Sequence, residues 1–465
     1  MQVMKFGAVS VGEVARLRDV VNIVKDAVDE DRGLVVVCTA HPKTTDMLIN
    51  AARVAATGAE AQAEAARREL WNRHRSLAEK LVGDEWEREA LYREWADLLK
   101  QFDRITRAIA TLGEPSPRGI DAVAVIGERF IAHLFAVVLR QGGVAARMTD
   151  AADLVVTDDH FGAAEVDPVQ SMERIHKRLS YLMQAGIVPV ITGYIGATAD
   201  GVTTTLGRGG GDYSAALIGA ALQAREVTIW TDVDGILTAD PKLVAEARSL
   251  AELSYVEAGE IATFGAEVLH PRTLLPLAGS NIVLRLRNAL QPANAGTAIL
   301  MKPRPNQNSA RAIISAANLC LLKVAASAHV TWSPLMATRA LSLLHDSGVE
   351  VLSFAQSFSE RSMSLCVRAP DATFARDCLR AAFDVADPAN ADAGQITQEA
   401  VALVAVISAP GGDVEPRVLT ALGRSKAHVL ALNRAIGGAH LSMIIPEAEL
   451  RDIVRVMHQE LGLAA

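Results

Sequence analysis

The alternation of short apolar runs with helical segments through the first 300 residues most constrains the fold. Residues 33–38 are a continuous apolar run, which is typical of a strand covered on both faces of a sheet. Helical stretches are expected from about Val14, up to Leu139 and up to Gln184. Further strands are expected over residues 3–6, 120–125, 144–148, 154–157, 188–192 and 226–231. This rhythm predicts an α/β fold, a mostly parallel sheet sandwiched by helices.

Two segments depart from the alternation. Residues 59–102 are rich in Ala, Glu, Arg and Leu and contain no Pro, which predicts a helical hairpin with its hinge near residues 82–84. The polar segment 303–308, PRPNQN, breaks helix and strand alike. We therefore expect a first domain over residues 1–302 and a linker over residues 303–315.

Beyond the linker, the order strand, helix, strand, strand, helix occurs twice. The first copy is expected over residues 316–396 and the second over residues 397–465. Short α+β repeats rarely stand alone, so the pattern predicts two small α+β domains in tandem.

Composition excludes several classes of function. The net charge is −8, and no stretch is dense in Lys and Arg, so a nucleic-acid partner is not expected. No uninterrupted apolar segment approaches the roughly 20 residues that span a bilayer, and the N-terminus lacks the apolar run of a signal peptide. The four cysteines form no CxxC pair, which indicates reduced thiols and no metal site. A cytoplasmic protein without a membrane partner is expected.

The segment TTTLGRGGGDYS, residues 203–214, carries the strongest chemical signal. Its three consecutive glycines let backbone amides approach an anion at the start of a helix, where the helix dipole favours negative charge. The guanidinium group of Arg208 can bind a carboxylate through two hydrogen bonds, and Asp212 can orient a lysine or the phosphoryl acceptor. No Gly-Lys-Ser/Thr closes the loop, so it is not a Walker A loop. The alternative is a tight turn in which Asp212 only caps the helix.

Three weaker signals point to the same chemistry. Lys5 ends the first expected strand beside Gly7, where it can neutralise the charge of a transferred phosphoryl group. The acidic residues of 230–235 follow a buried strand, at the edge where nucleotides bind in open α/β sheets. Glu128 opens a helix and can receive an ammonium group. Each has a plain structural alternative: a solvated lysine, a capped turn and a dipole-favoured surface glutamate.

Together these residues resemble the aspartokinase family. The matching segments follow the family order over about 300 residues, namely KFGxxSVG at 5–12, GER at 127–129, TTTLGRGGxDYSAA at 203–216, WTDVDGILTADPK at 230–242, FGAxVLHP at 264–271 and GTAI at 296–299. The C-terminal part resembles the paired ACT domains of that family, and Gln356 and Ser357 match its effector-binding strand.

The resemblance implies phosphorylation of the β-carboxylate of L-aspartate by ATP with Mg²⁺, which opens the aspartate-family amino-acid pathway. By this resemblance, Lys5 and Asp212 serve phosphoryl transfer, and Thr45, Glu128 and Arg208 hold aspartate. The implied nucleotide site comprises Gly7, Ala8, Thr231, Asp232, Asp234, Lys242 and Glu267. An amino-acid effector is also implied. A homodimer through the ACT-like domains is expected because their exposed strand edges need covering.

Several positions depart from the family pattern. Ala8 and Val9 replace a glycine and a threonine of the phosphate loop, Gly211 replaces a serine, and residues 38–41 replace a Ser-Ala segment. Glu267 replaces a lysine that faces the nucleotide phosphates. Three hypotheses follow: an active aspartokinase with a rearranged phosphate site, a kinase of another small carboxylate, and a catalytically impaired paralogue that binds amino acids and regulates a partner.

Overall fold

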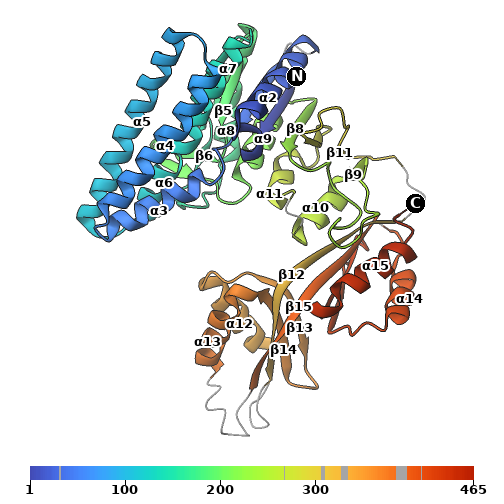
Figure 1. Ribbon diagram of the computed structural model, residues 1–465. Coiled ribbons are helices and arrows are strands. Elements are labelled where there is room, and N and C mark those ends of the chain that lie inside the picture. The colour runs from blue at the N-terminus through green and yellow to red at the C-terminus, as the bar shows by residue number, and fades with distance from the viewer. Residues whose placement is uncertain are drawn as a thin grey trace. The chain divides into compact units, whose positions relative to one another are not determined.

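The computed structural model shows two compact units (Figure 1). It describes residues 1–30, 33–265, 268–304, 309–325, 334–383, 395–409 and 411–464. The first unit comprises residues 1–236, 249–262 and 267–304, and the second comprises residues 237–248, 263–266 and 305–465.

The first unit is built on an eight-stranded sheet with the strand order β3-β5-β2-β1-β8-β10-β11-β9. The strands are β1 (Gln2–Phe6), β2 (Leu34–Cys38), β3 (Ala146–Thr149), β5 (Val188–Thr192), β8 (Glu226–Thr231), β9 (Glu252–Ser254), β10 (Val283–Asn288) and β11 (Thr297–Leu300). Neighbouring strands are parallel except β10 and β11. A small second sheet contains β4 (Val156–Thr157), β6 (Ile195–Thr198) and β7 (Thr203–Thr205). The predicted mostly parallel α/β architecture is confirmed.

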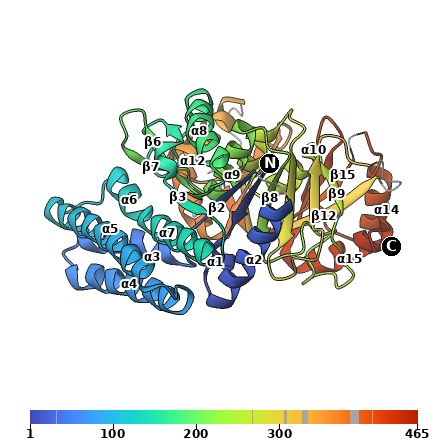
Figure 2. The ribbon, with the colours of Figure 1, turned by 90° about the horizontal axis from the view of Figure 1, so that it is seen from above.

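Helices cover this sheet, and α3, α4, α5 and α7 group beside it in Figure 2. The helices of the unit are α1 (Ala8–Val11), α2 (Val14–Glu30), α3 (Thr44–Ala56), α4 (Glu60–Leu81), α5 (Glu85–Leu112), α6 (Pro117–Ala124), α7 (Ile126–Gln141), α8 (Pro168–Gln184), α9 (Gly210–Ala221), α10 (Tyr255–Thr263) and α11 (Pro271–Leu274), with short 3₁₀ turns η1 (Ala151–Asp153) and η2 (Leu275–Leu277). The predicted hairpin is α4 and α5, and its hinge lies at residues 82–84.

Aromatic side chains join the hairpin to the sheet. Trp95 of α5 stacks on Phe130 of α7 with ring centroids 5.1 Å apart, and its indole N–H donates to the Phe130 carbonyl over 3.0 Å. Phe6 of β1 packs edge-on against Phe135 and stacks on Trp230. The stretch 117–141 is long and apolar enough to cross a membrane, but 83% of its most apolar window is buried inside the protein, as is usual for a core helix.

One strand prediction was wrong in this unit, and another strand is shorter than predicted. Instead of a strand, residues 120–124 form most of helix α6, and Val125 is its C-cap. Ser116 caps that helix by accepting from the Gly119 amide over 3.2 Å, and Pro117 occupies its first turn. These start signals outweigh a short apolar run, which cannot by itself distinguish strand from buried helix. The strand expected over residues 154–157 shortens to β4.

The second unit contains a six-stranded antiparallel sheet with the order β13-β14-β12-β15-β17-β16. Its strands are β12 (Ala310–Ala325), β13 (Val351–Ser357), β14 (Ser362–Arg368), β15 (Gln395–Ser408), β16 (Ala431–Arg434) and β17 (His440–Pro446). Its helices are α12 (Pro334–Asp346), α13 (Ala372–Phe383), α14 (Glu415–Ser425) and α15 (Leu450–Glu460), with 3₁₀ turns η3 (Ala369–Asp371) and η4 (Glu447–Glu449).

The long strands β12 and β15 run through both α+β halves of this sheet. The first part of β12, including Ala310 and Ile313, packs in one hydrophobic core with α14 and α15. Its last part, including Leu322, packs in a second core with α12 and α13. Each α+β half therefore contains parts of both β12 and β15. The sequence instead predicts a linker over residues 303–315 and a domain boundary at residue 396.

Candidate active site

Five of the predicted site residues line one cavity of about 480 Å³ in the first unit. They are Lys5, Thr45, Glu128, Arg208 and Asp212. They come from the end of β1, the first turns of α3 and α7, the loop before α9, and the first turn of α9. Residues more than 200 positions apart meet here because the carboxyl ends of parallel strands and the following helix starts lie at one edge of the sheet.

Lys5 and Asp212 form the charged centre of the cavity. The Lys5 Nζ lies 2.6 Å from Asp212 Oδ1, and the two side chains are 12% and 17% exposed. An ion pair with so little solvent holds its geometry more tightly than a surface pair. Gly7 leaves the ammonium uncovered, because a Cβ at that position would lie 3.3 Å from Nζ. The arrangement can hold an anion against Lys5 at the start of α9.

Glu128 is 3% exposed, and its carboxylate is only partly satisfied by the protein. Oε1 accepts from the Ala40 amide over 3.5 Å, and the nearby Thr45 side chain helps to stabilise the charged form of the carboxylate. Oε2 has no hydrogen-bond partner among the described residues. Burial raises the pKa of Glu128 to about 7. A buried acceptor aimed into a cavity is suited to receive the ammonium group of a ligand.

Arg208 lies between two glycines at the mouth of the cavity. Gly207 and Gly209 have φ angles of 72° and 71°, and a Cβ at Gly209 would lie 2.6 Å from the Cβ of His270. The Arg208 guanidinium is exposed and makes no ion pair or hydrogen bond with the described residues. The two glycines therefore permit the turn, which leaves the Arg208 guanidinium free to bind a carboxylate through two N–H donors.

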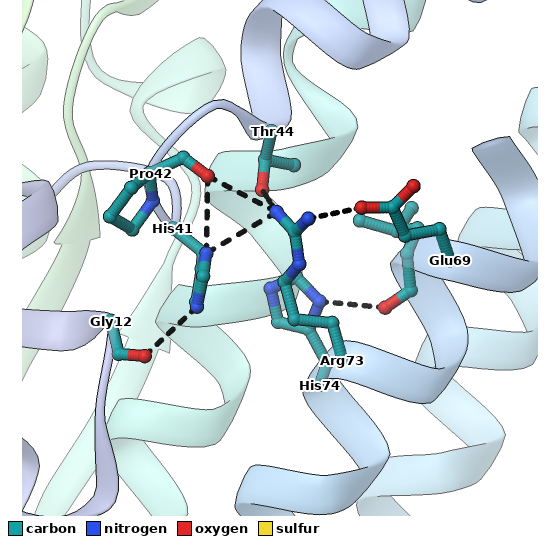
Figure 3. Close-up of polar contacts among 8 residues, drawn as sticks. Gly12, His41, Pro42, Thr44, Glu69, Arg73 and His74 are labelled. Carbon is teal, nitrogen blue, oxygen red and sulfur yellow. Dashed lines mark hydrogen bonds and ion pairs between the residues drawn. The ribbon is translucent and has the colours of Figure 1, made fainter.

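The segment after β2, which carries Thr45, is held by a side chain of the hairpin (Figure 3). Arg73 of α4 donates to the Pro42 carbonyl over 3.1 Å and to the Thr44 hydroxyl over 3.3 Å. It also forms an ion pair with Glu69 of the same helix. The hairpin thus anchors one wall of the cavity.

His41 completes this anchor. Its Nε2 lies 2.9 Å from the Gly12 carbonyl, and its Nδ1 lies 3.4 Å from Arg73 Nη1. A carbonyl only accepts, so Nε2 carries the proton that is shared with Gly12. With Nδ1 unprotonated, the neutral ring accepts from Arg73, whereas the Pro42 carbonyl, 3.2 Å from the same Nδ1, favours a proton there. Burial and the Arg73 charge lower the pKa of His41, which favours this neutral form.

Gly211 has a structural partner that explains one departure from the family pattern. A Cβ at position 211 would lie 2.4 Å from the Cγ2 of Thr39, closer than such atoms approach in proteins. Thr39 itself belongs to the segment 38–41 that differs from the family. The two departures therefore fit each other, because the methyl group of one fills the space that a side chain at the other needs.

The predicted nucleotide residues after β8 are not among the residues that line this cavity. Thr231 donates to the Asp232 carboxylate over 3.2 Å, and Asp232 is exposed. Asp234 Oδ1 accepts from the side-chain amides of Asn288 over 2.8 Å and Asn294 over 3.2 Å. In this structure Asp234 ties its loop to the loop after β10.

The remaining nucleotide predictions fall in several places. Gly7 caps α1 and lies beside Lys5, and Ala8 is the first residue of that helix. Lys242 belongs to the second unit, where it is exposed and its carbonyl accepts from Arg451 over 3.1 Å. Glu267 lies outside the described residues, so the prediction for it remains a prediction.

The predicted effector residues lie at the end of β13, an edge strand of the second unit. The side-chain nitrogen of Gln356 is buried and has no hydrogen-bond partner among the described residues. The Ser357 hydroxyl lies 3.3 Å from that of Ser359 and accepts from the Glu360 amide.

Five further residues line the cavity and were not predicted as site residues: Thr39, Asp46, Ile49, Gly162 and Tyr194. Tyr194 has a positive φ of 71°, and its amide donates to the Ser214 hydroxyl over 3.1 Å, which places the loop after β5 against α9. No local pattern marks these positions, because the tertiary fold alone brings them to the cavity.

Comparison with known proteins shows the family of the chain. Residues 1–288 match the amino acid kinase family. The chain belongs to that family. This amino acid kinase is 30% identical over 477 residues to the bifunctional aspartokinase/homoserine dehydrogenase 2 of Arabidopsis thaliana, covering 99% of the chain and 51% of the relative. The chain spans about half the length of the first curated relatives it matches.

Bacterial relatives are also similar. The lysine-sensitive aspartokinase 3 of Escherichia coli is 40% identical over 208 residues, which are 44% of this amino acid kinase and 46% of that protein. The structure of E. coli aspartokinase III in complex with aspartate and ADP has a TM-score of 0.80 at 28% identity, with 99% of this chain and 100% of that chain covered. The complex of the same enzyme with lysine and aspartate has a TM-score of 0.83, also at 28% identity, with 99% of both chains covered.

Proposed function

We propose that this chain is an aspartate kinase that transfers the γ-phosphoryl group of ATP, bound with Mg²⁺, to the β-carboxylate of L-aspartate. The product is 4-phospho-L-aspartate, which opens the aspartate-family amino-acid pathway. One observation carries the proposal: the Lys5–Asp212 ion pair, the unpartnered oxygen of Glu128 and the free Arg208 line the same cavity. The solved relative with aspartate and ADP supports it.

The cavity has charges that complement an amino diacid. Arg208 holds the α-carboxylate through paired N–H donors, and the free oxygen of Glu128 accepts from the α-ammonium. Thr45, which lines the same cavity, helps to stabilise the charged form of Glu128. The β-carboxylate then points toward the Lys5–Asp212 pair.

The chemistry requires positioning and charge neutralisation rather than a general base. A carboxylate is already a nucleophile, and phosphoryl transfer spreads negative charge over the oxygens of the transferred group. Lys5 neutralises part of that charge, and Asp212 fixes the direction of its ammonium. Mg²⁺ reaches such sites with the nucleotide phosphates and needs few protein ligands. Gly7 and the glycines before Asp212 leave room for those phosphates.

The test is a hydroxylamine assay, because an acyl phosphate forms a coloured hydroxamate. Purified full-length protein with MgATP and L-aspartate is expected to form hydroxamate and ADP in equal amounts. L-Glutamate and D-aspartate serve as acceptor controls. Turnover with another carboxylate but not with L-aspartate would show that the acceptor is different. Binding of aspartate in calorimetry without any turnover would indicate a non-catalytic protein that binds amino acids.

Arg73 is expected to act as a positioning residue for the aspartate pocket, which is the cavity lined by Lys5, Thr45, Glu128, Arg208 and Asp212. In Arg73→Met, the segment 42–45 loses two hydrogen bonds, and we expect the KM for aspartate to rise about tenfold while the KM for ATP stays unchanged. Arg75→Met is a matched control, because Arg75 lies on the same helix and interacts with exposed Glu79 and with Tyr92 of the hairpin rather than with the segment 42–45. Equal kinetics of the two variants would contradict this role.

The fit between Thr39 and Gly211 predicts a rescue. Gly211→Ala places a methyl group against Thr39, and overpacking of this kind costs about 1–3 kcal/mol. We expect Gly211→Ala to lower kcat/KM roughly tenfold and the double variant Thr39→Ser/Gly211→Ala to recover most of the loss. Thr39→Ser alone serves as the control. A double variant no better than Gly211→Ala would show that the two side chains are uncoupled.

We further propose that the second unit binds an amino-acid effector and joins two chains. The buried, unpartnered nitrogen of Gln356 supports a polar ligand at the end of β13. The sheet also has two edge strands, β13 and β16, which need a partner or a cover. Light scattering at micromolar concentration is expected to give the mass of a dimer, and a monomer would rule out this assembly.

A further inference from the structure

A second cavity, of about 870 Å³, lies in the first unit and does not share a lining residue with the aspartate pocket. Strand β3 at the edge of the sheet, the 3₁₀ turn η1 and one face of helix α8 form its walls, and Gly201 also lines it. Its size is within the range of small-molecule sites.

Unpaired cations dominate the wall of this cavity. Arg147, Arg174 and Lys177 make no ion pair or hydrogen bond with any described residue. The two carboxylates in the wall are already neutralised, since Asp153 lies 3.1 Å from Arg178 and Asp150 lies 2.6 Å from the guanidinium of Arg129. The cavity therefore carries about three uncompensated positive charges in a chain whose net charge is −8.

The spacing on α8 places these groups together. Lys177, Arg178 and Tyr181 follow Arg174 by three, four and seven residues, so the four side chains share one face of the helix. Arg147 of β3 lies across from them. Tyr181, Met148 and Leu182 add aromatic and aliphatic surface to the same wall.

A solvated basic surface is the plainest alternative, but it explains only the charges. A solvated face leaves its cations spread apart, whereas these converge from a strand and a helix on one hollow that also has apolar walls. The guanidinium group of arginine can donate two parallel hydrogen bonds to the oxygens of a phosphate or carboxylate group. The apolar wall can pack against an aromatic or aliphatic part of the same ligand.

We propose that this cavity binds an anionic small molecule that carries two or more phosphate or carboxylate groups next to an aromatic or aliphatic part. This inference does not rest on the proposed kinase activity. The site is tied to the aspartate pocket, however, because Asp150 in its wall holds Arg129, the residue after Glu128.

Calorimetry of the full chain with inorganic tripolyphosphate, and separately with citrate, tests the proposal and distinguishes phosphate from carboxylate recognition. We expect one site per chain that persists in saturating MgADP and aspartate, and weakens with salt. Arg147→Gln/Arg174→Gln is expected to weaken binding roughly tenfold or more, since each change removes a charged donor. Arg104→Gln, an exposed arginine of α5 outside the cavity, is the matched control and is expected to bind as the natural chain does.

Three results would overturn the proposal. The first is no binding of either probe at millimolar concentration. The second is binding that disappears in MgADP, which would place the probe in the nucleotide site. The third is equal affinity of the double variant and the natural chain. Neither Arg147 nor half-buried Arg174 has an ion-pair or hydrogen-bond partner among the described residues. The double variant is therefore expected to keep the melting temperature of the natural chain. A loss of binding can then be attributed to the two arginines.

Discussion

Lys5→Met is expected to lower kcat at least a hundredfold while the affinity for aspartate changes less than about threefold. Removing one preorganised donor to a charge that develops in the transition state costs about 2.7–4 kcal/mol, which is a factor of about a hundred to a thousand. The proposed aspartate contacts of Glu128 and Arg208 are not changed by this substitution, so binding is expected to be retained. Stopped hydroxamate assays give kcat, and calorimetry gives the affinity.

The same substitution leaves the carboxylate of Asp212 largely buried without its cation, which destabilises the protein. Lys5→Met/Asp212→Asn removes both charges and controls for this effect. We expect the double variant to melt at a higher temperature than Lys5→Met and to stay equally inactive. Turnover within tenfold of the natural chain in either variant would remove Lys5 from the chemistry.

The centre of the site could be predicted from the sequence because its parts follow simple rules of the fold. Lys5 ends a buried strand, whereas Glu128 and Asp212 occupy the first turns of helices. In a parallel sheet those positions share one edge, so residues with the right chemistry there were expected to meet. The glycines around Arg208 signalled backbone geometry that other residues adopt at a cost.

Other parts depended on tertiary contacts that leave no local pattern. Arg73 lies on a helix that reads as a charged, solvated hairpin, and only the packing of α4 against the segment after β2 gives it a role. Asp234 fitted a nucleotide site by position, yet Asn288 and Asn294 engage it from more than 50 residues away. Side chains brought together across such distances are set by the fold and not by spacing.

The second unit shows the same limit at the level of domains. The repeat of strand and helix order was visible in the sequence, and the two hydrophobic cores correspond to it. The sequence could not show that β12 and β15 each pass through both cores, because a long strand and two short ones look alike when their residues are equally apolar. Boundaries drawn between repeats therefore fell inside strands.

Aspartate binding is expected to depend on pH through Glu128. Burial raises the pKa of this carboxyl to about 7, so below that pH the free protein carries a neutral acid that cannot pair with the substrate ammonium. The KM for aspartate should rise about tenfold for each unit of pH below 7 and should level off above pH 8. His41 has a pKa below its ordinary value, so its own titration falls at lower pH.

Glu128→Gln separates binding from stability. The variant should have a high KM that no longer changes near pH 7, because the titrating group is gone. A raised carboxyl pKa means that the folded state binds the proton more tightly than the unfolded state, so the free energy of unfolding falls as pH rises from about 4.5 to about 7. Glu128→Gln is therefore expected to unfold at higher denaturant concentration than the natural chain at pH 8, and to lose that advantage at pH 5. A KM for aspartate in the natural chain that stays flat between pH 5.5 and pH 8 would mean that Glu128 does not hold the ammonium, because that contact cannot survive protonation of its acceptor.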